Sequence, residues 1–371
     1  MAGFPFMRQA EAFLSSLPFI LLLAVFILPC PMSAAAKPRP AIAFVHLLLP
    51  PGGEPHASPA GWIGSLDRAR DTLESLRIPT IVSSASPGNA EDLNELSEMD
   101  PEVLITTSPL LYAAACDVAK RSPNTVFFAC TDETVHDNMS GFQARTYEAH
   151  YLAGLIAGAL SEDGVIGYLA NDPYQSKASR LRNANAFTLG AQKSKAAIRV
   201  LYAPGNDPDE ELKTLIAAGA DIVDLERALP SLVERLREHS VRYVGTAGRT
   251  VDPLCLAAPE WEWNNAFGDL LTQVRFGIWR PRNVSYGIKE GVVGLSPFGP
   301  AVPETVRVRV REAKEAIRNG ASPFEGPVRD VSGSLRIAEG SVPDDATLRG
   351  MDWRVQGLEP LPLTPDGLQG L

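Results

Sequence analysis

The chain has 371 residues, of which 45% are hydrophobic and 21% charged, and its formal net charge at pH 7 is −10. Proteins that bind nucleic acid need a positive surface, and no cluster of Lys and Arg with interleaved aromatic residues occurs here, so composition argues against that class. A chain of this length exceeds what one compact core usually supports, so we expect two lobes.

The first 36 residues have the three parts of an export signal. Arg8 stands in the basic part, Phe19–Leu28 is an apolar run, and small residues precede Lys37. The run is too short for a membrane span, which needs on the order of 20 apolar residues. We therefore predict that residues 1–36 are cleaved and that the mature protein is periplasmic, with a retained N-terminal anchor as the alternative.

The four cysteines bear on whether the exported protein is lipid-anchored and whether it contains a disulfide. Cys30 raises the alternative of lipid anchoring, but Pro29 before it is a poor fit to the small residue that lipidation requires. Cys116, Cys130 and Cys255 remain after cleavage, without the Cys-x-x-Cys spacing of metal or redox sites. We expect three buried thiols, and a disulfide between Cys116 and Cys130 is the alternative.

The first half of the remaining chain alternates short apolar runs with segments of helical spacing. This alternation predicts a parallel sheet covered by helices on both faces. The expected strands are 41–49, 80–82, 103–105 and 125–128, and the expected helices are 62–76, 90–98 and 109–120.

The same alternation restarts after Arg145 and predicts a second, similar sheet. Its strands are expected at 165–169, 198–202, 221–225 and 241–244, and its helices after Arg145 and at 176–192, 209–218 and 230–238. The remaining sequence predicts a helix over 261–279, a strand over 284–295, a helix over 304–319, and a hairpin over 324–337 with Gly333 near its turn.

Five segments occur in the order found in one known family. They are Gly61–Trp62, Arg145–Gly154, Asn185–Ala191, Gly287–Phe298 and Gly350–Trp353. On these segments the chain resembles the basic membrane protein (PnrA-like) family of ABC-transporter substrate-binding proteins. The resemblance implies a type I periplasmic-binding-protein fold of two doubly wound lobes, with three chain crossings that form a hinge.

The alternation and the implied crossings together give a domain division. The signal peptide covers 1–36, the N-terminal lobe 37–143 plus 259–290, and the C-terminal lobe 144–258 plus 291–371, including a C-terminal extension.

Ligands of open parallel sheets bind outside the carboxyl ends of the strands. The candidate ligand-binding residues follow strands or stand near a joint, and they are Trp62, Thr107, Ser108, Asp132, Asn171, Asn206, Arg249 and Trp263.

Trp62 is the strongest candidate, because an indole at the mouth of a β/α loop can stack on a planar ligand for roughly 1–3 kcal/mol. It also coincides with the Gly-Trp segment of the family. The alternative interpretation is that it begins the first helix and packs on Leu66. Trp261 and Trp263 have i, i+2 spacing, so at least one is expected in the core. We place Trp263 on the ligand side, with packing at the hinge as the alternative.

The sequence departs from the nucleoside-binding members of the family. Those members have a polar side chain just before the first aromatic residue and a second aromatic residue from the other lobe, whereas this chain has Pro59–Ala60 and Gly205–Asn206. Asp132, Asn171 and Asn206 can instead hydrogen-bond a ring or a ribose, although an acidic residue after a strand is often only a helix cap. Arg145 and Arg249 can hold an anion, but Arg145 can equally pair with Glu148.

Catalytic and metal-binding patterns are absent from the sequence. It has no phosphate-binding loop, nucleophile elbow or His-Glu-x-x-His motif, and its five histidines lack ligand spacing. We therefore predict a monomeric, non-enzymatic protein without a cofactor or metal. The resemblance implies that it captures a small planar solute, with a purine nucleoside or base as first choice, and delivers it to an ABC permease. A periplasmic sensing module and a nucleoside or sugar hydrolase are the alternatives.

Overall fold

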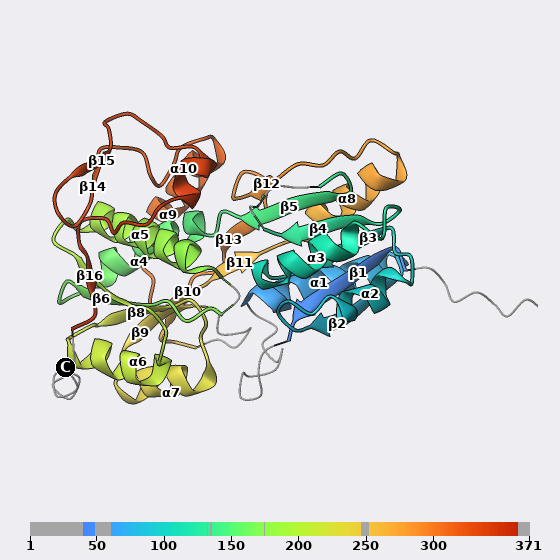
Figure 1. Cartoon of the computed structure of the whole chain (residues 1–371). Coiled ribbons are helices and arrows are strands. Elements are labelled where there is room, and N and C mark those ends of the chain that lie inside the picture. The colour runs from blue at the N-terminus through green and yellow to red at the C-terminus, as the bar shows by residue number, and fades with distance from the viewer. Residues whose placement is uncertain are drawn as a thin grey trace, which may run out of the picture. The chain divides into compact units, whose positions relative to one another are not determined.

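The computed structural model describes residues 40–48, 61–131, 133, 136–173, 175–245 and 252–362. They contain two six-stranded sheets, each with parallel pairing throughout (Figure 1). Each sheet carries helices on both faces, as the alternating pattern of the sequence predicted. The predicted fold class, two doubly wound parallel-sheet lobes, is confirmed.

The sheet of the first lobe has the strand order β12-β5-β4-β3-β1-β2. Strand β1 is buried throughout, and its side chains point alternately to the two faces. The strands are β1 (Ile42–Leu47), β2 (Thr80–Ala85), β3 (Val103–Thr106), β4 (Val126–Cys130), β5 (Met139–Ala144) and β12 (Val284–Tyr286).

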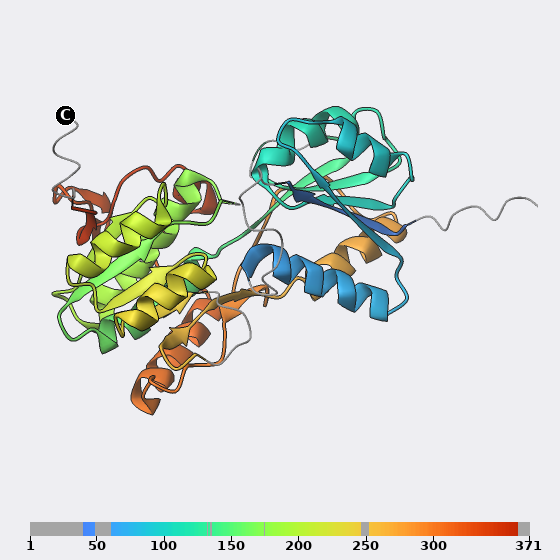
Figure 2. The same cartoon turned by 90° about the horizontal axis from the view of Figure 1, so that it is seen from below.

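The helices of the first lobe form two layers. One face of the sheet, which includes Ile42 and Phe44, packs on α1 (Gly61–Ser75) and α8 (Asn264–Arg275). The other face packs on α2 (Glu91–Ser97) and α3 (Tyr112–Ala119), and α3 follows the short helix η1 (Pro109–Leu111). Figure 2 shows the blue α1 and orange α8 on the side of this sheet opposite the teal helices.

The sheet of the second lobe has the order β10-β9-β8-β6-β7-β16. Its strands are β6 (Val165–Leu169), β7 (Arg199–Ala203), β8 (Ile222–Leu225), β9 (Arg242–Gly245), β10 (Cys255–Ala257) and β16 (Leu358–Pro360). Its helices are α4 (Tyr147–Leu160) and α5 (Lys177–Ser194) on one face, and α6 (Pro208–Ala217) and α7 (Pro230–Glu238) on the other.

Helices α4 and α5 pack unusually closely, because glycines of each meet the backbone of the other. A Cβ atom added to Gly154 would lie 2.1 Å from the carbonyl oxygen of Phe187, and one added to Gly190 would lie 2.1 Å from that of Tyr151. The segments Arg145–Gly154 and Asn185–Ala191, on which the family resemblance partly rests, therefore lie at the contact between α4 and α5.

The chain passes between the two sheets three times. The first passage joins β5 to α4, the second joins β10 to α8, and the third follows β12. The second and third passages pair with each other as antiparallel strands β11 (Pro259–Trp261) and β13 (Val293–Leu295). The three crossings that the family resemblance implied are thus present, while the domain boundaries stay a prediction.

The predicted strand over 284–295 is two strands. Strands β12 and β13 belong to different sheets. A turn separates them, in which the N–H of Val292 donates to the carbonyl of Gly287 and Gly291 has a φ of +75°. The sequence prediction treated this segment, which contains three glycines and the charged pair Lys289–Glu290, as one continuous strand.

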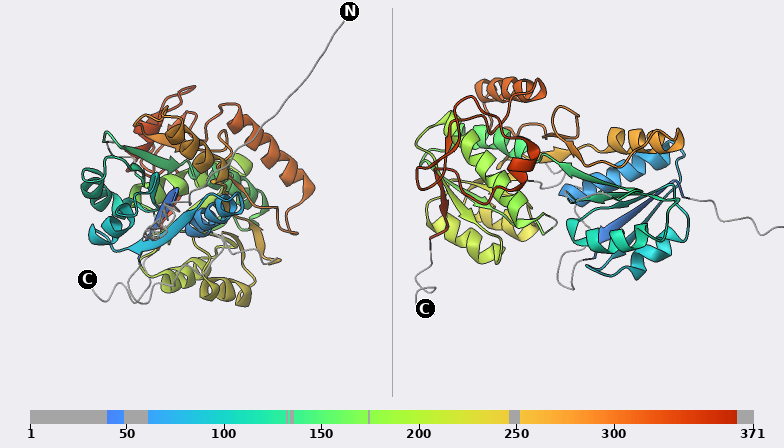
Figure 3. Two further views of the ribbon diagram at one scale, coloured as in Figure 1. Left: turned by 90° about the vertical axis from the view of Figure 1, so that its right-hand side faces the viewer. Right: turned by 45° about the horizontal axis from the view of Figure 1, so that its top comes forward.

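The last segment of the described chain lies on the second lobe. Helix α9 (Glu304–Arg318) packs on α4, β14 (Val328–Arg329) and β15 (Leu335–Ile337) form the predicted hairpin, and α10 (Asp345–Arg349) contacts α5. Strand β16 then joins the edge of the sheet beside β7 (Figure 3). Cys116 and Cys130 are buried thiols and Cys255 is a half-buried one, so the alternative disulfide is not formed.

Candidate ligand-binding site

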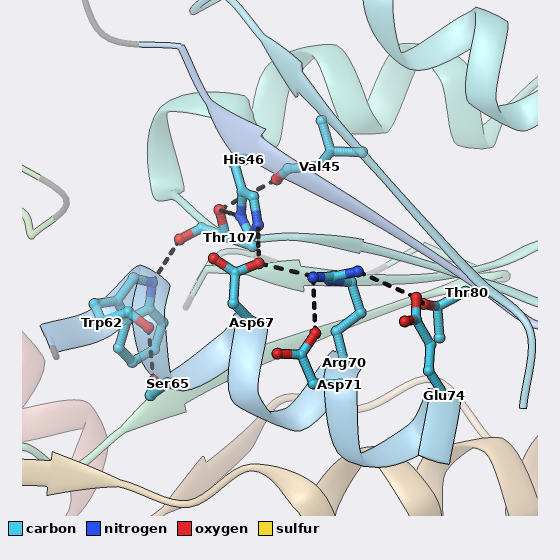
Figure 4. A network of polar contacts seen from close by, with 10 residues as sticks. All are labelled: Val45, His46, Trp62, Ser65, Asp67, Arg70, Asp71, Glu74, Thr80 and Thr107. Carbon is cyan, nitrogen blue, oxygen red and sulfur yellow. Dashed lines mark hydrogen bonds and ion pairs between the residues drawn. The ribbon is translucent and has the colours of Figure 1, made fainter. Parts of the chain in front are cut away.

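The carboxyl ends of β1 and β3 meet the first turn of α1 in the first lobe. Helix α1 begins at Gly61, whose φ of +86° suits glycine, and Trp62 follows at once. The indole Nε1 of Trp62 donates a hydrogen bond of 2.7 Å to the carbonyl oxygen of Thr107, the residue after β3 (Figure 4). The single polar atom of the indole is therefore used to fix its orientation.

Three aromatic side chains hold Trp62 from the sides. Its ring lies nearly parallel to that of Phe142, with centroids 6.4 Å apart, and the rings of Trp261 and Trp263 meet it edge-on at 5.8 and 5.2 Å. Trp62 nevertheless stays partly exposed. A rigid and partly exposed indole beside a strand end is a suitable stacking surface for a planar ligand.

Trp263 packs in the core, which was the alternative interpretation of the sequence. Its side chain is 0% exposed, it stacks on Phe267 with centroids 5.5 Å apart, and Tyr286 meets it edge-on. It therefore presents no surface to a ligand in this conformation and instead supports Trp62. Trp261 is also buried, and its Nε1 donates to the hydroxyl of Thr146 at 3.2 Å.

Thr107 and Ser108 are both fully buried. The Thr107 hydroxyl donates to the carbonyl of Val45 at 3.2 Å, and the Ser108 hydroxyl accepts the N–H of Leu110 as the cap of η1. Both side chains shape the strand ends, and neither is exposed to a ligand in this conformation.

His46 and Asp67 complete the polar network around Trp62. His46 Nδ1 lies 3.2 Å from the Thr107 hydroxyl, and its Nε2 lies 3.3 Å from an oxygen of Asp67 on α1 (Figure 4). The order of hydroxyl, imidazole and carboxylate is that of a hydrolytic triad, but the buried Thr107 hydroxyl offers no accessible nucleophile. The sequence analysis missed Asp67, because it stands in the middle of a helix rather than after a strand.

In the second lobe, Asn171 joins two of the loops at the carboxyl ends of the strands. Its Nδ2 donates to the carbonyl of Arg227 at 2.8 Å, and its Oδ1 accepts the N–H of Arg227 at 2.9 Å. Asn171 thereby ties the loop after β6 to the loop after β8. Asn206, after β7, has an exposed side chain, while its N–H donates to Glu211 at 3.1 Å.

Glu226 directly follows β8 and is the most perturbed acid at this edge. The hydroxyl of Tyr168 donates to it at 2.8 Å. Burial, assisted by the neighbouring Asp172 and Asp224, raises the pKa of Glu226 to about 7, although His150 opposes the shift. Perturbed acids at a strand end are typical of functional sites.

Ionic contacts tie the hinge segments together. Arg145, just after β5, donates to Glu148 at 2.7 Å, to Glu290 at 2.5 Å and to the carbonyl of Ser285 at 2.8 Å. Burial raises the pKa of Glu148 while Arg145 opposes that shift. The pairing of Arg145 with Glu148, one of the two roles expected from the sequence, is thus the one observed.

Two predicted site residues, Asp132 and Arg249, lie outside the described residues. Within the part of the chain that the structure describes, no group of three or more His, Cys, Asp or Glu side chains could hold a metal ion. The same part contains no helix that is long and apolar enough to cross a membrane.

Two parallel α/β lobes joined by three crossings define the type I periplasmic-binding-protein fold. A solute-binding protein of an ABC transporter system from Conexibacter woesei has the same fold, with a TM-score of 0.59, 18% identity, and coverage of 76% of this chain and 97% of that one.

Sequence comparison finds similarity to one family of proteins. The model of the PnrA-like ABC transporter substrate-binding proteins matches residues 66–217. A purine-binding protein of Brucella abortus is 28% identical over 344 residues, which cover 88% of this chain and 95% of the relative. A putative ABC transporter glucose-binding protein of Haloferax volcanii is 28% identical over 307 residues, which cover 76% of this chain and 78% of the relative. The chain is thus similar to the PnrA-like family of ABC transporter substrate-binding proteins, the family that its sequence motifs resemble.

Proposed function

We propose that this protein is exported, captures a small planar solute with a purine-like ring, and delivers it to an ABC permease. The observation that carries the proposal is the orientation of Trp62, whose only polar atom is bound to Thr107 and whose ring is held by three aromatic side chains while it stays partly exposed. Such a ring can contribute stacking to a flat ligand without losing side-chain freedom on binding.

The second lobe contributes polar rather than aromatic groups in this proposal. Asn206 is exposed at the end of β7, and Asn171 and Glu226 stand at the ends of β6 and β8. Hydrogen bonds from these loops would recognise the edge of a ring or a ribose, and Asp132 and Arg249 stay candidates for the same role. Trp263, Thr107 and Ser108, which were predicted to contact the ligand, act in the proposal as supports of Trp62.

The proposed mechanism is closure of the lobes around the ligand. A ligand that contacts both lobes only when they are closed shifts the population toward the closed state by the difference between its two affinities. The permease would then recognise the closed form. A monomer is sufficient for this mechanism.

The relatives suggest the ligands that should be tested first. The Brucella relative is named for purine binding, and the Haloferax relative for glucose binding. The indole can stack on a purine, and an aromatic ring can also face the apolar side of a sugar, so glucose is the second candidate.

Thermal unfolding with adenine, adenosine, guanosine and glucose separates these candidates. A ligand at a hundredfold excess over its Kd stabilises the native state by about 2.7 kcal/mol, which a melting curve detects. We expect stabilisation by a purine base or nucleoside. Stabilisation by glucose alone would replace the purine assignment, and a lack of response to all four would contradict the choice of ligand.

Export and the rival functions have their own tests. N-terminal sequencing of the mature protein should find a start near Ala36 or Lys37, and an acylated Cys30 would establish the lipid-anchored alternative. Incubation with nucleosides should release no free base, because the Thr107 hydroxyl, which lies beside His46, is fully buried. A sensing role would require binding to a membrane receptor rather than to a permease, which co-purification from membranes distinguishes.

A further inference from the structure

Arg180 occupies a position in the second lobe that is equivalent to the position of Trp62 in the first. In each sheet the first strand in chain order, β1 or β6, lies between the second and the third, in the orders β3-β1-β2 and β8-β6-β7. The helix that follows this strand is α1 in one lobe and α5 in the other, and Trp62 and Arg180 lie within the first four residues of these helices. The two side chains therefore stand at equivalent places on the carboxyl edges of their sheets.

Backbone carbonyls hold the guanidinium of Arg180 over two strand ends. Its Nη1 donates to the carbonyl of Ala170, directly after β6, at 2.7 Å and to that of Pro204, directly after β7, at 3.1 Å. Gly205, with a φ of +78°, allows the two loops to meet here, because a Cβ atom on it would lie 2.2 Å from the same Ala170 carbonyl oxygen. The guanidinium is thus fixed at the edge where ligands of parallel sheets bind.

The other edge of this guanidinium, formed by Nε and Nη2, makes no hydrogen bond to the described residues. In Arg199 and Arg275 the same two atoms donate together to one carboxylate, that of Glu359 or of Glu102, at 2.7–3.1 Å. In Arg180 the Nε is a buried donor, which is costly to leave without an acceptor, while Nη2 is not buried. A ligand with two adjacent acceptor atoms would satisfy both.

The acid that follows β7 is engaged elsewhere. Glu211, on α6, uses its two carboxylate oxygens to accept the N–H of Gly205 at 2.6 Å and that of Asn206 at 3.1 Å. Arg180 itself forms no ion pair with a carboxylate of the described residues. Because a guanidinium has donors only, arranged as a planar fork, it selects a group that presents two acceptors side by side in one plane.

We propose that Arg180 selects 6-oxopurines, such as hypoxanthine and guanine, over adenine, an inference that rests on the proposed function. The oxygen on C6 and the ring nitrogen N7 of such a base are two acceptors on one edge, which match an arginine fork. Adenine has an amino group in place of the oxygen, so one hydrogen bond is lost and two donors face each other. In the proposed closed form, the ring stacks on Trp62 while its C6 edge meets Arg180.

Calorimetry with hypoxanthine and adenine at about pH 7 tests the selection, because the two bases share one ring system and differ in the group on C6. We expect the wild type to bind hypoxanthine roughly tenfold to a hundredfold more tightly than adenine. In Arg180→Gln, whose amide offers both a donor and an acceptor, this ratio should fall to about one or reverse. Arg180→Lys keeps the charge without the planar fork and should give an intermediate ratio.

The ratio of the two affinities separates recognition from structural support. If Arg180 only ties the loops together, its replacement should weaken the binding of both bases equally and leave the ratio unchanged. Lys193→Gln is the matched control, because it removes an exposed positive charge from the last turn of the same helix, and it should keep the wild-type ratio.

Equal affinities of the wild type for the two bases, or an unchanged ratio in a folded Arg180→Gln, would overturn the inference. If Arg180→Gln does not fold, Arg180→Lys decides, and an unchanged ratio in that variant would overturn it as well. Failure of the proposed function gives a different result: neither base binds the wild type, and the purine ligand and its selection fail together. Binding of both bases without preference removes only the selection by Arg180.

Discussion

The indole N–H of Trp62 and the carbonyl of Thr107 form a hydrogen bond of 2.7 Å between residues 45 positions apart in the chain. This bond ties the first turn of α1 to the end of β3, so the sheet fixes the orientation of the indole that we propose as a stacking surface. Because this bond and three aromatic contacts fix the indole in the ligand-free structure, the proposed site needs no rearrangement of Trp62 on binding.

Removal of the Trp62 side chain should weaken binding. Trp62→Ala should lose on the order of 1–3 kcal/mol with a planar ligand, which is roughly tenfold to a hundredfold in Kd, as measured by calorimetry. The melting temperature should also fall, because Trp62 packs on Phe142 and two tryptophans. Trp353→Ala removes a partly buried indole of the C-terminal segment and should bind normally. Normal binding by Trp62→Ala together with a large loss of stability would assign Trp62 to packing alone.

The hinge ion pairs should differ sharply in their effect on stability. Arg145→Ala leaves the carboxylate of Glu148, which is 5% exposed, without its cation and should cost about 3–5 kcal/mol in chemical denaturation. Glu290→Gln removes a more exposed partner of the same guanidinium and should cost less than about 1 kcal/mol. Equal effects of the two substitutions would show that the burial of Glu148 does not matter.

Two substitutions of helical glycines by alanine should have opposite effects on the stability of the protein. Gly154→Ala forces a methyl group to within 2.1 Å of the Phe187 carbonyl, so α4 and α5 must separate, at a cost of about 1–3 kcal/mol or more. Gly268→Ala on α8 meets no atom within 4 Å and should stabilise the protein by roughly 0.5–1 kcal/mol. Thermal melts of the two variants test whether the backbones of α4 and α5 are in direct contact at Gly154.

Ligand binding should make the protein more compact in solution. If the lobes close as rigid bodies on their three crossings, a saturating ligand reduces the radius of gyration measured by X-ray scattering. Trp62→Ala at the same ligand concentration is the control and should show a smaller change. Superimposable curves for the free and the saturated wild type would rule out closure.

Much of the fold could be predicted from the sequence because local patterns specify it. The strands and helices of both lobes gave regular apolar periodicity, and Gly333, with φ +82°, marked the hairpin correctly. Strand β5 was missed because Met139–Ala144 contains Gly and Gln and has little alternation. The break between β12 and β13 was missed because it depends on pairing with partners in two different sheets.

The candidate site was harder to predict, because it depends on contacts between distant residues. The sequence marked Trp62 but gave no sign that Thr107 would accept its N–H, nor that Asp67 would approach His46. The placement of Trp263 in the core follows from Phe267 and Tyr286, which lie on separate elements. His150 and Asp224 are 74 positions apart, so their contact could be found only in three dimensions.

Strand β16 has a consequence for the integrity of the second lobe. By pairing with Val200–Tyr202 it occupies the backbone groups of β7 that would otherwise form an open sheet edge, and Pro360, which has no N–H, stands on the new outer strand. A chain shortened before Leu358 would expose the edge of β7 as a template for pairing with other molecules. Strand β16 therefore protects the edge of β7 from pairing with other molecules. Truncation before Leu358 should cause self-association of the protein before any loss of solute binding.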